Sequence, residues 1–349
     1  MNDENILEIK NLNVSFRVRG SEIEAIHDIS LNLKKHETLA IVGESGSGKS
    51  VLTKAFTGML EQNGRISHGT IDYKGTRLSD LRVNKQWDKI RGKEIATIFQ
   101  DPMTSLDPIH TIGSQISEVV VKHQKKTKKE AKKIAIDLME KTGIPNAVKR
   151  YNEYPFEYSG GMRQRIVIAI ALACRPEVLI CDEPTTALDV TIQAQILDLI
   201  KELQEEYKFT IIFITHDLGV VASIADRIAV MYSGRIIEIG TCEEIFYDSR
   251  HPYTWNLLSS LPQLARKGEE LKSIPGTPPS LYKKIVGDAF APRNQYAMSV
   301  DFKAEPPMFK VTDTHYAKTW LLDKRAPKIQ KPEVIQNLHQ HMLEMTAEN

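Results

Sequence analysis

Residues 43–50, which read GESGSGKS, have the residue types of a phosphate-binding loop. Glycines allow positive φ, so successive backbone N–H groups can point at one anion, and a helix that begins directly after them adds the positive end of its dipole. Lys49 supplies a cation for the β- and γ-phosphates of a nucleotide, and the Ser50 hydroxyl is placed to hold Mg²⁺. Because Lys and Ser follow the last glycine in this order, the segment predicts a nucleotide site rather than a structural glycine-rich turn.

Four further polar side chains follow short apolar segments that we predict to be buried strands: Gln100, Asp182, Glu183 and His216. In a parallel α/β sheet ligands bind at the carboxyl ends of the strands, so we expect these side chains at one edge. Asp182 can hold Mg²⁺ through water, and Glu183 can direct an attacking water. A solvated turn is the alternative for the two carboxylates, and a surface position is the alternative for the histidine.

Two weaker signals accompany these residues. Ser159, Gly160 and Gly161 precede an apolar helix predicted over residues 166–174, and they would aim free backbone N–H groups at an incoming charge. Phe16 lies at the end of a predicted strand, where its ring could stack on a purine. Taken alone, an aromatic residue in this place is more often part of a core.

Hydrophobic patterns predict the elements that position these residues. Alternation predicts strands of a small antiparallel layer at 6–16 and 23–33. Further strands are expected at 38–42, 69–73, 94–99, 178–181, 210–214, 227–231 and 235–239, and we expect the sheet to end with the last two, a hairpin about Ser233 and Gly234. Helices are predicted at 51–59 and around 192–203, and a third follows a capping box of Thr127 and Glu130 and ends near Gly143.

Composition sets the broad class. The chain has 349 residues, which suggests about two domains, and its formal net charge of +1 argues against a protein whose main task is to neutralise nucleic acid. The three cysteines have neither disulfide density nor metal-site spacing, which indicates a reducing cytosol. We find no apolar signal segment and no uninterrupted apolar run of about 18 residues, so we expect a chain that is neither secreted nor membrane-spanning. Seven lysines between Lys122 and Lys133 either contact anionic lipid or form a solvated helix face.

The order of these pieces over residues 6–245 resembles the ATP-binding cassette of ABC transporters. The resemblance implies an α/β fold: a P-loop ABC nucleotide-binding domain with a RecA-like parallel core, an antiparallel β subdomain and an α-helical signature subdomain at about 101–165. The residues that it assigns to ATP binding are Phe16, which would stack on adenine, and Gly43, Glu44, Ser45, Gly46, Ser47, Gly48, Lys49, Ser50 and Val51.

The resemblance also assigns roles in catalysis. Glu183, His216 and Gln100 are the implied catalytic residues, and Ser50, Gln100 and Asp182 are the implied Mg²⁺ ligands. Ser159, Gly160 and Gly161 are the implied signature, facing the ATP of a partner cassette, and residues 187–189 with Asp189 are the implied D-loop. The signature departs from the usual Leu-Ser-Gly-Gly-Gln at Tyr158 and Met162, but its phosphate-facing core is intact.

Two stretches narrow the resemblance to the OppD-type ATPase subunits of oligopeptide permeases. They are residues 100–108 (QDPMTSLDP) and a Pro-rich tail with the pieces HPY at 251–253, IPGTPPSL at 274–281 and FAPR at 290–293. We therefore expect an ABC ATP-binding domain at 1–248 and a small irregular C-terminal extension at 249–349. In many such proteins cysteines at the positions of Asp288 and Asn294 help to bind an iron–sulfur cluster. Residues 243–349 contain no cysteine, so no cluster is expected.

The resemblance implies the ATP-hydrolysing subunit of a membrane importer that takes up oligopeptides, with ATP and Mg²⁺ as cofactors. It would lie on the cytoplasmic face of the cell membrane as a peripheral protein. The implied partners are a second, homologous ATPase in a heterodimer, two transmembrane permease subunits and, through the complex, an extracytoplasmic solute-binding protein, with no nucleic acid. A homodimer is the alternative from symmetry.

Two other functions remain open from the sequence. The same transport role for dipeptides, nickel or another small solute is one alternative. A soluble cassette ATPase of DNA repair or of ribosomes is the other. Repair ATPases carry a very long insertion between the glutamine and the signature, whereas Gln100 and Ser159 are 59 residues apart here. Ribosomal members carry two cassettes in one chain, and this chain has one.

Overall fold

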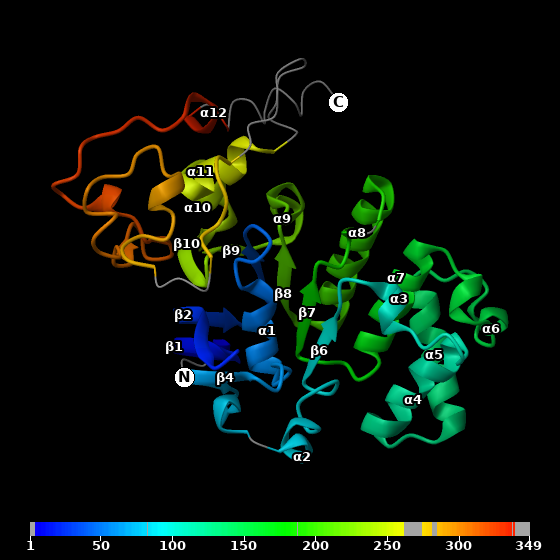
Figure 1. The fold of residues 1–349 in the computed structure, drawn as a ribbon. Helices are drawn as coiled ribbons and strands as arrows, with labels where there is room; N and C mark the ends of the chain where they lie inside the picture. The colour runs from blue at the N-terminus through cyan, green and yellow to red at the C-terminus, as the bar shows by residue number, and fades with distance from the viewer. Residues whose placement is uncertain are drawn as a thin grey trace. The chain divides into compact units, whose positions relative to one another are not determined.

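The computed structural model describes residues 4–81, 83–186, 188–261, 274–280, 285–336 and 338. These residues form two compact units (Figure 1). The first unit takes in the described residues of 1–33, 39–79 and 215–349, and the second takes in those of 34–38 and 80–214. Among the described helices, none has the length and apolar character needed to span a membrane.

An antiparallel sheet in the order β2-β1-β4-β5 forms one layer of the first unit. Its strands are β1 (Asn5–Val18), β2 (Ser21–Lys34), β4 (Gly64–Tyr73) and β5 (Thr76–Arg77). The pairing of β1 with β4 is irregular between Lys10 and Val14. This irregularity resets the register, so that Ile9 before it, Leu12 within it and Val14 at its end are all buried. The two strands predicted by alternation are confirmed, each slightly longer than predicted.

A second sheet of the first unit carries the phosphate loop. Its described order is β11-β12-β10-β9-β3, from β3 (Thr38–Val42), β9 (Arg227–Tyr232), β10 (Arg235–Thr241), β11 (Phe309–Lys310) and β12 (Tyr316–Ala317). The predicted hairpin is confirmed, but the prediction that the sheet ends there is wrong, because β12 pairs with β10 at Glu238 and Ala317. Strands of two residues leave no periodicity that could be seen in the sequence.

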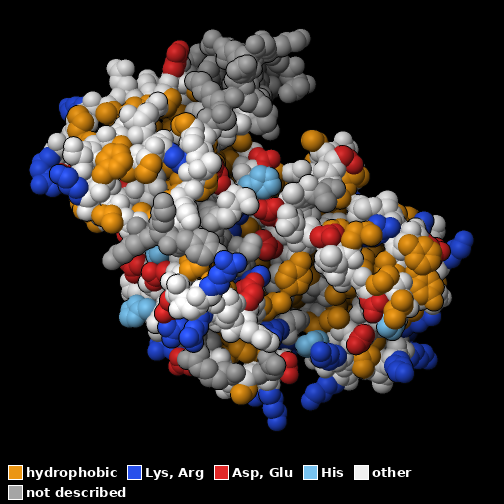
Figure 2. Space-filling model, in the orientation of Figure 1, with side chains coloured by type: hydrophobic (Ala, Val, Ile, Leu, Met, Phe, Trp, Pro, Cys, Tyr) orange, Lys and Arg blue, Asp and Glu red, His pale blue; other side chains and the backbone are white. Residues whose placement is uncertain are grey.

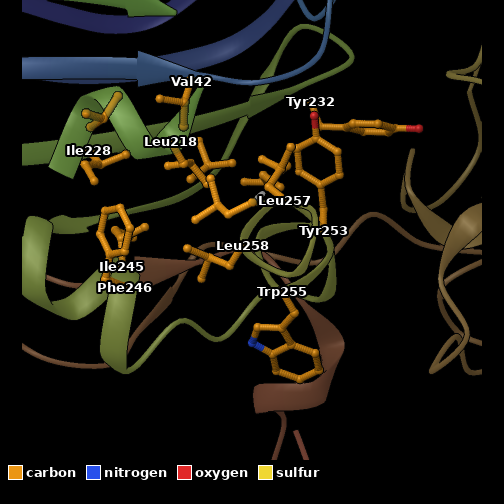
Figure 3. Packing of buried hydrophobic residues seen from close by; sticks show 14 of the residues in the cluster. Val42, Leu218, Ile228, Tyr232, Ile245, Phe246, Tyr253, Trp255, Leu257 and Leu258 are labelled. Atoms are coloured by element: carbon orange, nitrogen blue, oxygen red, sulfur yellow. The ribbon is translucent and has the colours of Figure 1, made fainter. Parts of the chain in front are cut away.

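The described residues of the predicted C-terminal extension (249–349) share a hydrophobic core with this sheet. The core joins Val42 and Ile228 of the sheet to three helices (Figure 3). Phe290 belongs to the same core. The helices are α9 (Leu218–Ile224), α10 (Cys242–Tyr247) and α11 (Pro252–Ser259). The other helical segments among the described residues of the unit are α1 (Lys49–Thr57), η1 (Leu78–Asp80), η4 (Ala291–Arg293), η5 (Trp320–Leu322) and α12 (Glu333–Gln336). The extension therefore packs into the same hydrophobic core as the strand β3 that leads into the phosphate loop.

The second unit combines parallel strands with a helical region. The strands β6 (Ile95–Ile98), β7 (Val178–Asp182) and β8 (Thr210–Thr215) pair in the order β8-β7-β6. The helical segments are α2 (Asn84–Trp87), α3 (Pro102–Ser105), α4 (Ile112–Gln124), α5 (Lys128–Lys141), α6 (Ala147–Arg150), η2 (Pro155–Glu157), α7 (Gly160–Leu172) and α8 (Val190–Tyr207). The capping box of Thr127 and Glu130 is confirmed. The lysines between Lys122 and Lys133 are exposed, and their contact with lipid stays a prediction.

Candidate functional site

The phosphate loop joins β3 to α1 in the first unit. A Cβ at Gly43 would lie 2.2 Å from the Met231 carbonyl oxygen, so only glycine fits where the loop crosses β9. Gly48 is the N-cap of α1 with φ 105, and no side chain caps the helix. The N–H groups of the first turn are therefore left for a ligand, as an anion site at a helix N-terminus requires. Ser45 and Gly46 are exposed, and Val51 is half-buried on α1.

Lys49 and the hydroxyls of Ser47 and Ser50 make the loop suitable for binding a phosphate together with a metal ion. The Lys49 ammonium is buried and donates to the carbonyl oxygens of Gly43 at 2.7 Å and Glu44 at 3.0 Å. The Ser47 hydroxyl is buried and has no hydrogen-bond partner among the described residues. Ser50 lies exposed in the first turn of α1. A cation, an orphaned hydroxyl and uncapped N–H groups suit phosphate oxygens, and the Ser50 oxygen suits a hard cation.

In the second unit the structure brings Glu183 and Gln100 together. The Glu183 carboxylate accepts from the Gln100 amide at 3.0 Å and from the Thr186 hydroxyl at 3.1 Å. Glu183 has φ 49, a left-handed conformation that costs roughly 1–2 kcal/mol for a residue with a Cβ. Its N–H donates to the Ile214 carbonyl at 2.9 Å, which anchors this conformation to β8. Backbone strain of this kind collects at functional sites. Nothing in the sequence pointed to Thr186 as a partner of Glu183.

Asp182 and His216 each lie at the end of a strand, as predicted. Asp182 is the last residue of β7 and is half-buried. His216 directly follows β8, lies in the first unit and is exposed, between the buried Thr215 and the half-buried Asp217. Asp217 caps α9 by accepting from the Gly219 N–H at 2.8 Å, which fixes the backbone next to the histidine. The roles of Asp182 and His216 stay predictions.

The Ser-Gly-Gly segment begins α7, six residues earlier than the predicted helix. Ser159 is the N-cap, and its hydroxyl accepts from the Met162 N–H at 3.4 Å. A Cβ at Gly160 would have only Leu188 within 4 Å, at 3.9 Å, whereas one at Gly161 would lie 2.7 Å from the Ile192 side chain of α8. Gly160 is therefore open to an incoming group, and Gly161 is required by helix packing.

Tyr158, where the signature departs from its usual form, is a core residue. It is buried, its hydroxyl donates to the Arg150 carbonyl at 2.8 Å, and burial raises its pKa to about 12. The buried tyrosine thus anchors the chain directly before the Ser-Gly-Gly segment, while Ser159 and Gly160 stay exposed. In the predicted D-loop, Asp189 caps α8 by accepting from the Ile192 N–H at 3.0 Å, while Ala187 lies outside the described residues.

Phe16 lies on β1 opposite Gly64 of β4. A Cβ at Gly64 would come within 2.6 Å of the ring, so the glycine lets the half-buried phenyl ring lie against the strand. Next to this pair is a hollow of about 530 Å³. It is lined by Arg17, Gly20, Glu22, Gln62, Asn63, Gly64 and Arg65. Stacking of Phe16 on adenine stays a prediction.

Asp288 and Asn294 take part in turns of the C-terminal extension. Asp288 accepts from the Phe290 N–H at 3.0 Å, and Asn294 accepts from the Tyr296 N–H at 2.9 Å. Burial raises the pKa of Asp288 to about 6. In the described part of the chain no group of three or more His, Cys, Asp or Glu side chains is placed to hold a metal ion. The expectation of no iron–sulfur cluster stays a prediction.

Two family models match the chain. Residues 26–186 match the model described as ABC transporter, and residues 237–300 match the one described as oligopeptide/dipeptide transporter, C-terminal region.

Curated relatives align with nearly the whole chain. The oligopeptide transport ATP-binding protein AmiE of Streptococcus pneumoniae is 68% identical over 97% of this chain and 96% of its own. The oligopeptide transport ATP-binding protein OppD of Bacillus subtilis is 58% identical over 95% and 92%. The dipeptide transport ATP-binding protein DppD of Lactococcus lactis is 57% identical over 94% of each chain.

Solved structures of ATP-binding cassettes match the fold. A dimeric cassette in a post-hydrolysis state with ADP and phosphate has a TM-score of 0.60 and 27% identity, covering 68% of this chain and 98% of that one. The cassette CbiO1 of the CbiONQ transporter of Clostridium perfringens has a TM-score of 0.60 and 31% identity, covering 70% and 91%.

Proposed function

The chain belongs to the ATP-binding subunits of ABC peptide importers and is an ATPase, and from this premise we propose which of its residues bind and hydrolyse ATP. The loop of residues 43–50 binds the phosphates through the uncapped N–H groups of α1 and through Lys49. On ATP binding, the Lys49 ammonium exchanges its contacts with the Gly43 and Glu44 carbonyls for phosphate oxygens. Phe16 stacks on the base.

Glu183 activates the attacking water, and Gln100 and Thr186 orient the Glu183 carboxylate. Their two hydrogen bonds go to the same carboxylate oxygen and fix the orientation of the carboxylate that accepts a proton from water. His216 contributes a further polar contact near the γ-phosphate. Ser50, Gln100 and Asp182 are the residues that would hold Mg²⁺, whose bound charge would neutralise the phosphates in the transition state.

The chain works in an ABC transporter complex, and we propose a heterodimer with a second, homologous ATPase. Ser159, Gly160 and Gly161 then serve the partner's ATP, since these residues begin α7 in an exposed position. The dimeric state of a similar cassette supports a paired arrangement.

Exposed hydrophobic side chains of the second unit favour the permease as a neighbour. Figure 2 shows such side chains over the helices of this unit, and the exposed residues there include Met103, Ile109, Val148 and Phe156. We propose that this surface docks on two transmembrane permease subunits at the cytoplasmic face of the membrane, with a solute-binding protein on the other side. Oligopeptides are the proposed cargo. Dipeptides are the second candidate, because the Lactococcus relative carries that name.

The observation that carries the assignment of the catalytic base is the strained Glu183 held by Gln100 and Thr186. Glu183→Gln keeps the shape of the side chain and removes its basicity, so we expect ATP binding to persist and turnover to fall by about 10²–10⁴-fold. The measurement compares MgATP affinity with the rate of phosphate release in the purified full chain or the transporter complex.

Glu177→Gln is the matched control, because this exposed carboxylate lies just before the other end of β7. It should keep wild-type turnover. If Glu183→Gln retained more than about a tenth of wild-type turnover, Glu183 would not be the base.

A further inference from the structure

The C-terminal extension contacts Glu44 of the phosphate loop through Arg293, a residue that belongs to none of the nucleotide motifs. Arg293 of η4 binds the Glu44 carboxylate with both terminal nitrogens, at 2.6 and 3.0 Å. A bidentate arginine–carboxylate pair fixes orientation as well as position. The Arg293 side chain is 3% exposed, whereas that of Glu44 is 27% exposed. The charge of the arginine is thus buried beside the loop and is compensated by a residue of the loop.

The surroundings of Arg293 hold it in place. Its Nε donates to the Pro275 carbonyl at 2.7 Å, and one terminal nitrogen donates to the Tyr232 hydroxyl at 3.2 Å. The guanidinium lies 5.7 Å from the ring centroid of Tyr232 and 6.0 Å from that of Phe290. The hydrogen bond to Glu44 raises the pKa of Arg293, so it stays charged. The arginine is therefore a fixed cation and not a mobile surface side chain.

A second residue of the extension holds the backbone of the same loop residue. The Tyr253 hydroxyl, from α11, accepts from the Glu44 N–H at 2.8 Å. Tyr253 is fully buried, with its ring centroid 4.7 Å from that of Tyr232 and 5.3 Å from that of Phe290. Figure 3 shows Tyr232 and Tyr253 next to each other in the core. Both the side chain and the main chain of Glu44 are thus held by the extension.

We propose that the C-terminal extension sets the conformation of the phosphate loop, with Arg293 and Tyr253 as positioning residues for ATP binding. This inference rests on the proposed function, because a positioned loop matters only in a chain that binds ATP there. The Glu44 carbonyl is one of the two acceptors of the Lys49 ammonium, so fixing Glu44 also fixes where the lysine lies before ATP arrives. A loop that is already ordered loses less conformational entropy on binding.

The coupling must act in both directions. If the extension improves ATP binding, ATP must stabilise the extension by the same free energy. Regulation of ATP binding through the extension then needs no contact between the extension and the nucleotide.

The test compares Arg293→Ala with the matched control Lys318→Ala in the full chain. Lys318 also belongs to the extension, is 15% exposed and pairs with Glu305, but no contact joins it to the loop among the described residues. Arg293→Ala should weaken MgATP binding about 5- to 20-fold and raise KM with kcat within about twofold. Lys318→Ala should keep wild-type affinity. Arg293→Lys, which keeps the charge without the bidentate pair, should fall between the wild type and Arg293→Ala.

Two further readouts separate positioning from loss of stability. The double variant Glu44→Ala/Arg293→Ala should bind MgATP no more weakly than the single variant with the lower affinity. The reason is that both substitutions break the same contact. Hydrogen exchange in the wild type should show that MgATP protects backbone amides near residues 290–296 as well as those of the loop. The hydrogen-exchange measurement uses only the wild-type protein, so it does not depend on whether a variant folds.

Equal MgATP affinity in folded Arg293→Ala and Lys318→Ala would overturn the inference, as would the absence of protection at 290–296 in the wild type. Failure of the proposed function looks different. In that case the wild type itself would not bind MgATP, or Lys49→Ala would bind it equally well.

Discussion

Two helix N-termini in this chain are preceded by glycines and predicted to face phosphate, yet they are built differently. At α1, Gly48 caps the helix in a left-handed conformation without a side-chain hydrogen bond, and a buried lysine follows directly. At α7, Ser159 caps the helix in an extended conformation, its own hydroxyl accepts an N–H, and glycines follow in place of a cation.

The difference indicates how each terminus is used. The α1 terminus has the charge, the free donors and the anchoring contacts at Glu44 to hold a phosphate by itself. The α7 terminus satisfies one of its own donors with the Ser159 hydroxyl and has glycine where α1 has Lys49, so it is suited to complete a site whose phosphate is already held elsewhere. This is the division expected if one chain's loop faces another chain's signature.

Lys49→Ala should have the largest effect on binding, because it removes a buried cation from the α1 terminus. Hydrogen bonds to charged groups contribute about 1.5–3 kcal/mol, which corresponds to a loss of MgATP affinity of roughly 10- to 150-fold. Lys54→Ala is the control on the same helix, where the half-buried lysine pairs with Glu61. Equilibrium binding of a fluorescent ATP analogue measures both. Equal losses in the two variants would remove the special role of the α1 terminus.

Gly43→Ala at the α1 terminus and Gly160→Ala at the α7 terminus should differ in their effect on the stability of the protein. The alanine Cβ at position 43 would collide with a backbone oxygen, so we expect the free energy of unfolding to fall by about 1–3 kcal/mol. At position 160 there is room, and the change should stay within about 0.5 kcal/mol. Thermal unfolding measures both changes. A larger loss at position 160 would contradict the view that this glycine is kept open for a partner.

Asp288 offers a smaller test, in the extension that contacts the phosphate loop at Glu44. Burial raises its pKa from 3.8 to about 6, and the nearby Asp301 and Glu305 act in the same direction. The folded state therefore keeps the proton to a higher pH than the unfolded state, so stability should fall as the pH rises from about 4 to about 6. Asp288→Asn should remove this fall and raise the melting temperature at neutral pH by a few degrees, about 2–4 °C per kcal/mol. If the stability of Asp288→Asn depended on pH in the same way as that of the wild type, Asp288 would not be the source of the fall.

Much of the fold was predictable because its elements carry their own signals. The capping box at Thr127, the strand that ends at Asp182 and the hairpin about Gly234 are local features, and the structure has all three. The strand pair β11 and β12 was not predictable, because its pairing with β10 depends on tertiary contacts between residues far apart in the sequence.

The candidate site shows the same division. The types and order of Lys49, Gln100 and Glu183 predict their chemistry, and the structure joins Gln100 to Glu183 by a hydrogen bond. Thr186 and Arg293 carry no such signal, because a threonine or arginine has many uses and only the folded chain shows what it touches. Positions 187 and 281, which the motifs included, lie outside the described residues.

The most direct test of the central claim is site-resolved ATP labelling and turnover in a two-ATPase complex in which only this chain carries Ser159→Arg. The arginine places bulk at the exposed α7 terminus, where the partner's phosphate must come. Our account predicts that this chain's own loop still binds ATP while hydrolysis at the partner's loop falls by about 10²–10³-fold, the usual cost of losing transition-state donors. Loss of ATP binding at this chain's own loop, with hydrolysis intact at the partner's loop, would contradict it.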